Sequence, residues 1–100
     1  MYDKYQKINE FDFFLEGLVV KLIQDTDVLA FLKNSKELLS QYPLRENIVL
    51  LWGTYKIVYE RYYQGLSKGE VGLLEKGICD LEFTLGNMES QRTNKSNLSH

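Results

Sequence analysis

The side chains that most often carry chemistry are few in this chain and are not grouped. Its one histidine, His100, is the last residue of the sequence, and its one cysteine, Cys79, lies well before it. A general base or an activated nucleophile needs a second group within hydrogen-bond reach, and no motif places one beside either residue. Cys79 falls at the edge of an apolar helical pattern, which favours a small packed side chain over a nucleophile. A lone cysteine also fits a reducing compartment.

Three carboxylates near the N-terminus form the acidic group that most resembles a metal site. Glu10, Asp12 and Glu16 fall within seven residues. A metal centre in a helical bundle, however, takes carboxylates from several helices and usually adds histidine. Charged side chains are rarely buried without a partner, so we expect these three on a solvated face. The glycines form no phosphate-binding motif either. We therefore predict that the protein is not an enzyme and uses no metal and no cofactor.

Charge and hydropathy argue against two classes of partner. The formal net charge is −2, whereas nucleic-acid-binding proteins present a basic surface that neutralises phosphate. The N-terminal residues lack the basic start and apolar run of a signal peptide, and no segment is apolar enough to span a membrane. The predicted location is the cytoplasm, with any membrane association made through a protein partner.

The elements that must position these residues are predicted to be helices, because apolar residues recur every three or four positions. The expected helices cover about residues 4–24, 27–41, 43–64 and 68–88. Pro43 ends the second helix and suits the first turn of the third. Ser67 and Glu70 form the S-x-x-E capping box that opens the fourth. Short connections make neighbouring helices antiparallel, so the predicted fold class is all-α, an up-and-down four-helix bundle over residues 1–88. The polar residues 89–100 are predicted to be a flexible, mobile C-terminal tail.

The third and fourth helices have the clearest inward faces. In the third, that face holds Leu44, Ile48, Leu51, Tyr55, Val58 and Tyr62, and in the fourth Val71, Leu74, Ile78, Leu81, Leu85 and Met88. This phase favours tyrosines that point into a small core over an exposed aromatic platform. The fourth helix also contains Gly72, Gly77 and Gly86, each of which costs roughly 0.5–1 kcal/mol relative to alanine unless it admits a neighbouring helix closely.

Apolar residues also lie on the outer faces of the predicted helices. They are Phe13 and Val20 in the first helix, Leu50 and Ile57 in the third, and Leu73 and Phe83 in the fourth. Such residues are common on protein surfaces or are covered by a neighbouring helix, and this interpretation stays open beside that of a binding patch. The predicted partner-binding residues are Leu50, Ile57, Arg61, Leu73, Phe83 and, in the tail, Arg92 and Lys95.

Two segments carry a family resemblance. They are Y-P-L-R-E-N-I-V-L-L-W-G-T-Y-K-I in the third helix and L-S-K-G-E-V-G-L-L-E-K-G-I at the start of the fourth, in a chain with a polar C-terminal tail. The sequence resembles the immunity proteins of pediocin-like (class IIa) bacteriocins, the enterocin A immunity family. The resemblance implies an antiparallel four-helix bundle that protects its host cell from the cytosolic side.

In that family, the immunity protein associates with the receptor of the bacteriocin once the peptide is bound. The resemblance therefore implies the membrane subunits of the mannose phosphotransferase permease as the partner, and a bound complex that keeps the pore from leaking. It also implies that the C-terminal half decides which bacteriocin is resisted.

Two other functions remain open from the sequence. One is a small homodimeric helical adaptor or regulatory protein, for example of phage origin, whose outer apolar pairs close a symmetric interface. The other is nucleic-acid binding through Lys56, Arg61 and the tyrosines, which needs the aromatic residues outside and is opposed by the helical phase. We expect a monomer or a weak homodimer.

Overall fold

The computed structural model contains four α-helices joined by short connections. It describes the backbone of residues 2–98 and the side chains of residues 10–89. The elements are α1 (Tyr2–Asp25), α2 (Val28–Gln41), α3 (Arg45–Tyr62), a short 3-10 helix η1 (Tyr63–Gly65) and α4 (Lys68–Leu98). Within the described residues there is no strand, and the predicted all-α class is confirmed.

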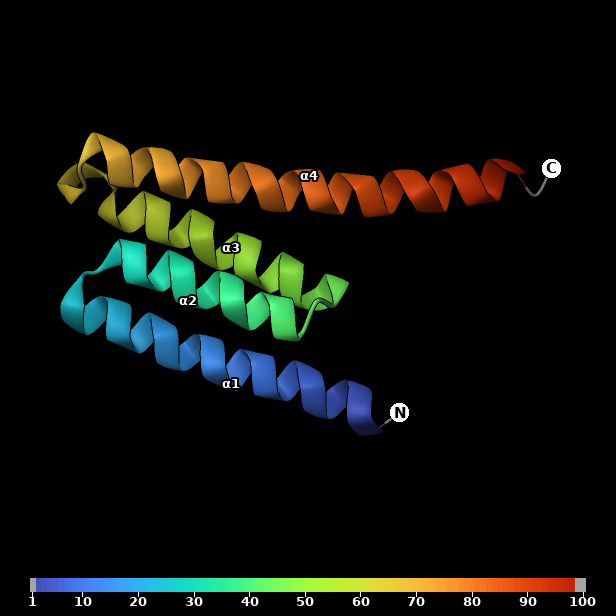
Figure 1. Ribbon diagram of the computed structural model, residues 1–100, viewed down its shortest axis with the longest axis horizontal. Coiled ribbons are helices and arrows are strands. Elements are labelled where there is room, and N and C mark those ends of the chain that lie inside the picture. The colour runs from blue at the N-terminus through green and yellow to red at the C-terminus, as the bar shows by residue number, and fades with distance from the viewer. Residues whose placement is uncertain (1, 99–100) are drawn as a thin grey trace.

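The helices lie side by side, and the chain changes direction at each of its connections (Figure 1). Contacts are most extensive between α1 and α2 and between α3 and α4. The two pairs of helices pack against each other, because α3 also contacts α1 and α2, and α4 also contacts α2.

The starts of the helices follow the predicted capping residues. The Asp27 carboxylate accepts a hydrogen bond from the backbone N–H of Ala30 at 3.1 Å, which caps α2. Pro43 lies in the connection between α2 and α3 and not, as predicted, in the first turn of the third helix, which begins at Arg45 after its N-cap residue Leu44. At the start of α4 the Glu70 N–H donates to Ser67 Oγ at 3.2 Å, and the Ser67 N–H donates to the Glu70 carboxylate at 2.9 Å. The predicted capping box is confirmed.

Two predicted helix ends differ from the structure. The third helix ends at Tyr62, and the chain continues as η1 before α4 begins. α4 does not end at Met88 but continues to Leu98. The physical reason is that residues 89–98 contain neither proline nor glycine, and polar residues alone do not interrupt a helix. A mobile tail was predicted for residues 89–100. The Glu89 side chain is described and pairs with Arg45 at 3.0 Å, and the side chains of residues 90–100 lie outside the described residues.

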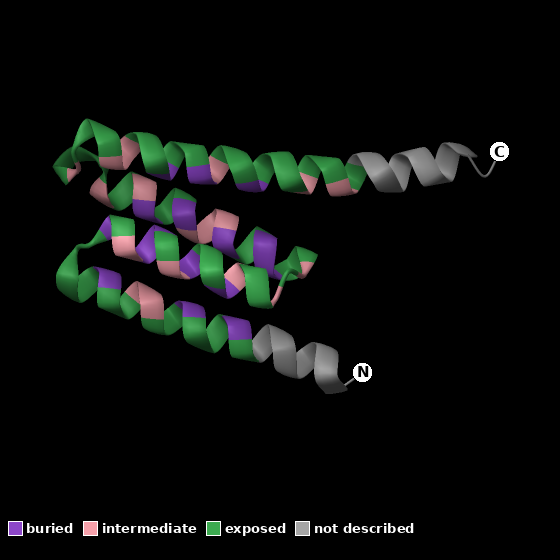
Figure 2. Cartoon of the chain, viewed as in Figure 1, coloured by how far each residue is buried: buried purple, intermediate pink, exposed green. Residues whose placement is uncertain are grey.

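All four helices contribute to one apolar core, and their buried residues face the neighbouring helices (Figure 2). The buried apolar residues are Phe11, Leu15, Leu22, Val28, Phe31, Leu32, Leu38, Ile48, Leu51, Tyr55, Val58, Leu74 and Leu81. The inward face predicted for α3 is confirmed at its centre. Among the described residues of α4, the buried ones are Leu74, Gly77 and Leu81, so this helix closes the core from its edge.

A buried hydroxyl pair crosses the core between α2 and α3. Tyr55 is only 1% exposed, and its hydroxyl lies 2.6 Å from Ser35 Oγ. Ser35 uses its single hydrogen to donate to the carbonyl of Leu32 at 3.1 Å, so Tyr55 is the donor to Ser35. The Tyr55 ring also meets Phe31 edge to face, with 5.8 Å between centroids. The prediction that the tyrosines point inward is therefore confirmed for Tyr55.

A second buried polar residue, Asn47, fixes the connection between α2 and α3. Its Nδ2 donates to the carbonyl of Tyr42 at 2.9 Å, just past the C-terminal end of α2. The same carbonyl also accepts from the backbone N–H of Leu44 at 2.8 Å, so the Asn47 side chain adds a second hydrogen bond that holds the turn. Neither Ser35 nor Asn47 was singled out by the hydrophobic pattern.

Gly77 is the glycine that allows close packing in the core. A Cβ at this position would lie 3.1 Å from Cε2 and 3.3 Å from Cδ2 of Tyr55. At Gly72 and Gly86 a Cβ would meet nothing within 4 Å. Close helix packing therefore accounts for one of the three glycines singled out in the interior of α4, and the other two lower its helical stability without a compensating contact among the described residues.

Candidate partner-binding surfaces

No described side chains form a cluster of the kind that holds a metal ion, taken as three or more His, Cys, Asp or Glu residues. Glu10, Asp12 and Glu16 are all exposed, as predicted for a solvated face. Glu10 accepts a hydrogen bond from the Tyr42 hydroxyl at 2.9 Å, and this bond raises the pKa of Tyr42. None of the described helices is long and apolar enough to cross a membrane.

Cys79 does not fill space in the core, and that prediction is wrong. The residue is exposed on α4. Its neighbour Ile78 turns toward the core, but at roughly 100° per residue Cys79 is rotated onto the flank of the helix, where a groove leaves it uncovered.

The outer face of α3 presents the two predicted apolar side chains to solvent, and Val49, which is 37% exposed, lies beside them. Leu50 is 38% exposed and Ile57 is 58% exposed. Gly53 lies between them on the same face, and a Cβ there would meet nothing within 4 Å. Arg61, one turn beyond Ile57, is also exposed. No neighbouring helix covers this pair, so the interpretation that a second helix buries them is excluded for the monomer.

The remaining predicted residues do not extend this face along one helix. Leu73 and Phe83 are both exposed on α4. They are ten residues apart, which separates them by roughly 80° around the helix axis. Arg92 and Lys95 lie outside the residues whose side chains the structure describes. The site residues predicted from the sequence are thus distributed over two helices and do not form one face.

The outer face of α1 contains an apolar surface that was only partly predicted. Phe13 and Val20 are exposed, and so is Phe14, which meets Phe13 edge to face with 5.6 Å between ring centroids. Together with Glu16 and Gly17 they line a shallow hollow of about 350 Å³. Phe14 was missed because it neighbours the inward stripe in sequence, and only the packing of α1 shows that nothing covers its ring.

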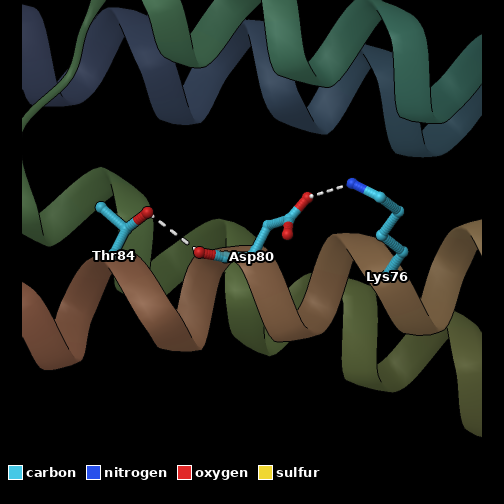
Figure 3. A network of polar contacts seen from close by, with 3 residues as sticks. All are labelled: Lys76, Asp80 and Thr84. Atoms are coloured by element: carbon cyan, nitrogen blue, oxygen red, sulfur yellow. Dashed lines mark hydrogen bonds and ion pairs between the residues drawn. The ribbon is translucent and has the colours of Figure 1, made fainter.

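One groove lies between α2 and α4. It has a volume of about 440 Å³, and its floor includes the buried side chains of Leu51 and Tyr55 from α3. Figure 3 shows Lys76, Asp80 and Thr84 on the side of α4 that faces α2. Lys76 Nζ pairs with the Asp80 carboxylate at 3.2 Å, and the Thr84 hydroxyl donates to the Asp80 carbonyl at 2.9 Å. The polar groups at this edge are therefore already paired within α4.

A second groove, the α3/α4 groove, runs along the opposite flank of α4. It has a volume of about 530 Å³ and is lined by Lys56, Tyr59, Glu60, Glu75, Ile78 and Cys79. The Tyr59 hydroxyl donates to the Glu75 carboxylate at 3.0 Å. This hydrogen bond is the largest of the influences that raise the pKa of Tyr59. This groove was not predicted, because its two walls come from different helices and no local pattern joins them.

Comparison with known proteins finds no family model, no curated protein and no solved structure that matches this chain.

Proposed function

We propose that this chain is an antiparallel up-and-down four-helix bundle that acts as an immunity protein against a pediocin-like pore-forming peptide. It protects the host cell from the cytoplasmic side by binding the complex of the bacteriocin with its membrane receptor, the mannose phosphotransferase permease subunits. The protein contributes binding and no catalysis. Support comes from the resemblance in the third and fourth helices and from the apolar residues that α3 exposes to solvent.

The observation that carries the proposal is the outer face of α3. The same helix buries Ile48, Leu51 and Val58 but holds Leu50 and Ile57 in water. Removing apolar surface from water contributes roughly 25 cal/mol per Å², so these two side chains favour association with any complementary apolar surface. Packing within the monomer leaves these two apolar side chains of α3 exposed to solvent.

Gly53 adds a second reason to expect a partner on this face. A glycine inside a helix is unfavourable by roughly 0.5–1 kcal/mol relative to alanine. At Gly53 there is no contact that explains this cost, because a Cβ would meet no atom within 4 Å. A partner that approaches the backbone between Leu50 and Ile57 explains the glycine, because the absence of a side chain lets the partner come close. Arg61 places a positive charge at the edge of the same face.

Leu73, Phe83, Arg92 and Lys95 are proposed as a separate contact that selects which bacteriocin is resisted. They belong to the C-terminal half, which the family resemblance assigns to specificity. Because they lie on α4 and not on the outer face of α3, the two sets of residues are separable by mutation.

The test compares two matched double variants in a bacterium that a pediocin-like peptide kills. Leu50→Ala with Ile57→Ala should abolish protection and leave the protein folded, because both side chains are already partly in water. Ile23→Ala with Leu29→Ala is the control, since these residues are 61% and 47% exposed and lie on α1 and α2. Circular dichroism checks folding. Full protection by the folded Leu50 and Ile57 variant would remove this face from the mechanism.

The exposed face of α1 favours a second candidate, a homodimeric helical adaptor. Phe13, Phe14 and Val20 surround a hollow over Gly17, and exposed aromatic rings are typical of protein interfaces. Light scattering separates the candidates. A stable dimer that Phe13→Ser converts to a monomer supports the adaptor, and a monomer at all concentrations argues against it.

A further inference from the structure

The α3/α4 groove has an aromatic wall on its α3 side. Lys56 Nζ lies over the Trp52 ring, 4.6 Å from its centroid. One turn further, the ring of Tyr59 stacks on that of Tyr63, with 5.5 Å between centroids and 9° between planes. These side chains follow one another at steps of four, three and four residues, so they form a stripe along α3 that continues into the first residue of η1, and Lys56 and Tyr59 of this stripe line the groove.

The α4 side of the groove carries carboxylates that this aromatic wall holds in place. Trp52 Nε1 donates to Glu82 at 3.0 Å, and the Tyr59 hydroxyl donates to Glu75 at 3.0 Å. Each carboxylate keeps further acceptor positions free, because a carboxylate accepts about four hydrogen bonds. Among the described side chains no lysine or arginine forms an ion pair with Glu75, Glu82 or the nearby Glu60.

The groove is therefore apolar at its base and negatively charged at its edge. Ile78 and the aromatic rings supply the apolar surface. Glu60 and Glu75 line the groove against the single ammonium of Lys56, and Glu82 lies two turns beyond Glu75 on α4 beside Trp52, so these four groups together carry a formal charge of −2. A groove with this combination is electrostatically complementary to a basic partner.

From this arrangement we propose that the α3/α4 groove binds a basic amphipathic helix of another protein. The apolar stripe of that helix covers Ile78 and the Tyr59 ring, and its lysine or arginine side chains bind Glu75 and Glu82. These two carboxylates are seven residues apart on α4, a distance of roughly 10 Å. The matching basic residues on the partner are then two helical turns apart. The inference stands on the groove and does not depend on the proposed immunity function.

Charge argues against the other occupants. An anionic lipid surface and a nucleic acid are both repelled by the carboxylates at the edge of the groove. A second copy of the chain would bring an acidic protein, of formal net charge −2, to an acidic groove. A basic helix gains from both the apolar base and the charged edge.

The chain contains two natural reporters for this groove. Trp52 is its only tryptophan, and Cys79, which lines the groove, is its only cysteine. The probe is a synthetic helical peptide of leucine and lysine, about four turns long, with lysines two turns apart. We expect a saturable change in Trp52 fluorescence and slower alkylation of Cys79, both weakened by added salt.

Substitutions that remove a charge but keep the shape of the side chain test whether the peptide binds in this groove. Glu75→Gln with Glu82→Gln should weaken binding of the peptide by roughly five- to tenfold, since each exposed ion pair contributes modestly. Glu16→Gln with Glu37→Gln, on α1 and α2, removes the same charge elsewhere and should leave binding unchanged. Lys56→Gln removes the one positive charge of the groove and should strengthen binding.

Three results would overturn the proposal. The first is equal binding of a leucine and glutamate peptide, which would show that charge has no part in recognition. The second is an equal loss of affinity in the Glu16 and Glu37 variant. The third is protection of Cys79 that rises with protein concentration and without peptide, which would assign the groove to a second copy of the chain.

Discussion

Replacing Gly53 by alanine should stabilise the folded protein and weaken its protective activity. Alanine is favoured over glycine inside a helix by roughly 0.5–1 kcal/mol. No atom lies within 4 Å of the position of the new Cβ, so there is no steric cost to subtract. For a domain of this size, the gain corresponds to a rise in Tm of about 2–8 °C. The added methyl group would stand on the face that we propose contacts the receptor.

Gly77→Ala is the matched comparison, because it makes the same chemical change against a packed neighbour. The new Cβ would lie 3.1 Å from the Tyr55 ring. That ring has little freedom to move, since its hydroxyl is bonded to Ser35 and its edge contacts Phe31. Overpacking a core typically costs 1–3 kcal/mol. The cost offsets or exceeds the helical gain, so Gly77→Ala should be less stable than Gly53→Ala by at least about 1 kcal/mol.

Thermal and urea denaturation followed by circular dichroism give the two stabilities, and killing assays give the activity. If Gly77→Ala gains as much stability as Gly53→Ala, α4 does not pack on Tyr55 as closely as described. If Gly53→Ala is more stable and protects as well as the unchanged protein, no partner approaches α3 closely at that residue.

Three further outcomes concern the fold. Ser35→Ala should cost about 1–3 kcal/mol because the buried Tyr55 hydroxyl loses its partner, whereas Tyr55→Phe should cost only about 1 kcal/mol. In urea unfolding, the double variant Ser35→Ala with Tyr55→Phe should lose less stability than the two single variants lose together. Additive losses would contradict the hydrogen bond between these two hydroxyls. Burial raises the pKa of Tyr55 above 10.0, so the unfolded chain loses this proton first and stability should fall as pH rises above about 10, less steeply in Tyr55→Phe. Ser67→Ala should cost about 1 kcal/mol through loss of the α4 cap, and Glu70→Gln, which keeps a capping acceptor, should cost less.

The helices and their inward faces were predictable because they depend on local spacing. Ile48, Leu51, Tyr55 and Val58 follow a three-and-four repeat that leaves one arrangement with a buried apolar stripe. The capping box at Ser67 is likewise a local signal. The end of α4 has no such local signal. The polar composition of residues 89–98 predicts that the helix ends before them, but these residues contain no helix breaker and the helix continues.

The candidate sites were harder to predict because they depend on which helices are neighbours. Leu50 and Ile57 could be assigned to the outer face of α3, but whether a second helix covers them is a property of the assembled fold. Cys79 was misplaced for the same reason. The partnership of Trp52 with Glu82 joins residues thirty positions apart, and no periodic pattern links them.

Immunity is best measured as the survival of sensitive bacteria that produce this protein in their cytoplasm. They are exposed to a panel of pediocin-like peptides and to unrelated pore-forming peptides. If the protein confers immunity, we expect survival against one or a few pediocin-like peptides and normal killing by the unrelated ones. Killing by every pediocin-like peptide, with folded protein present in the cells, would contradict it.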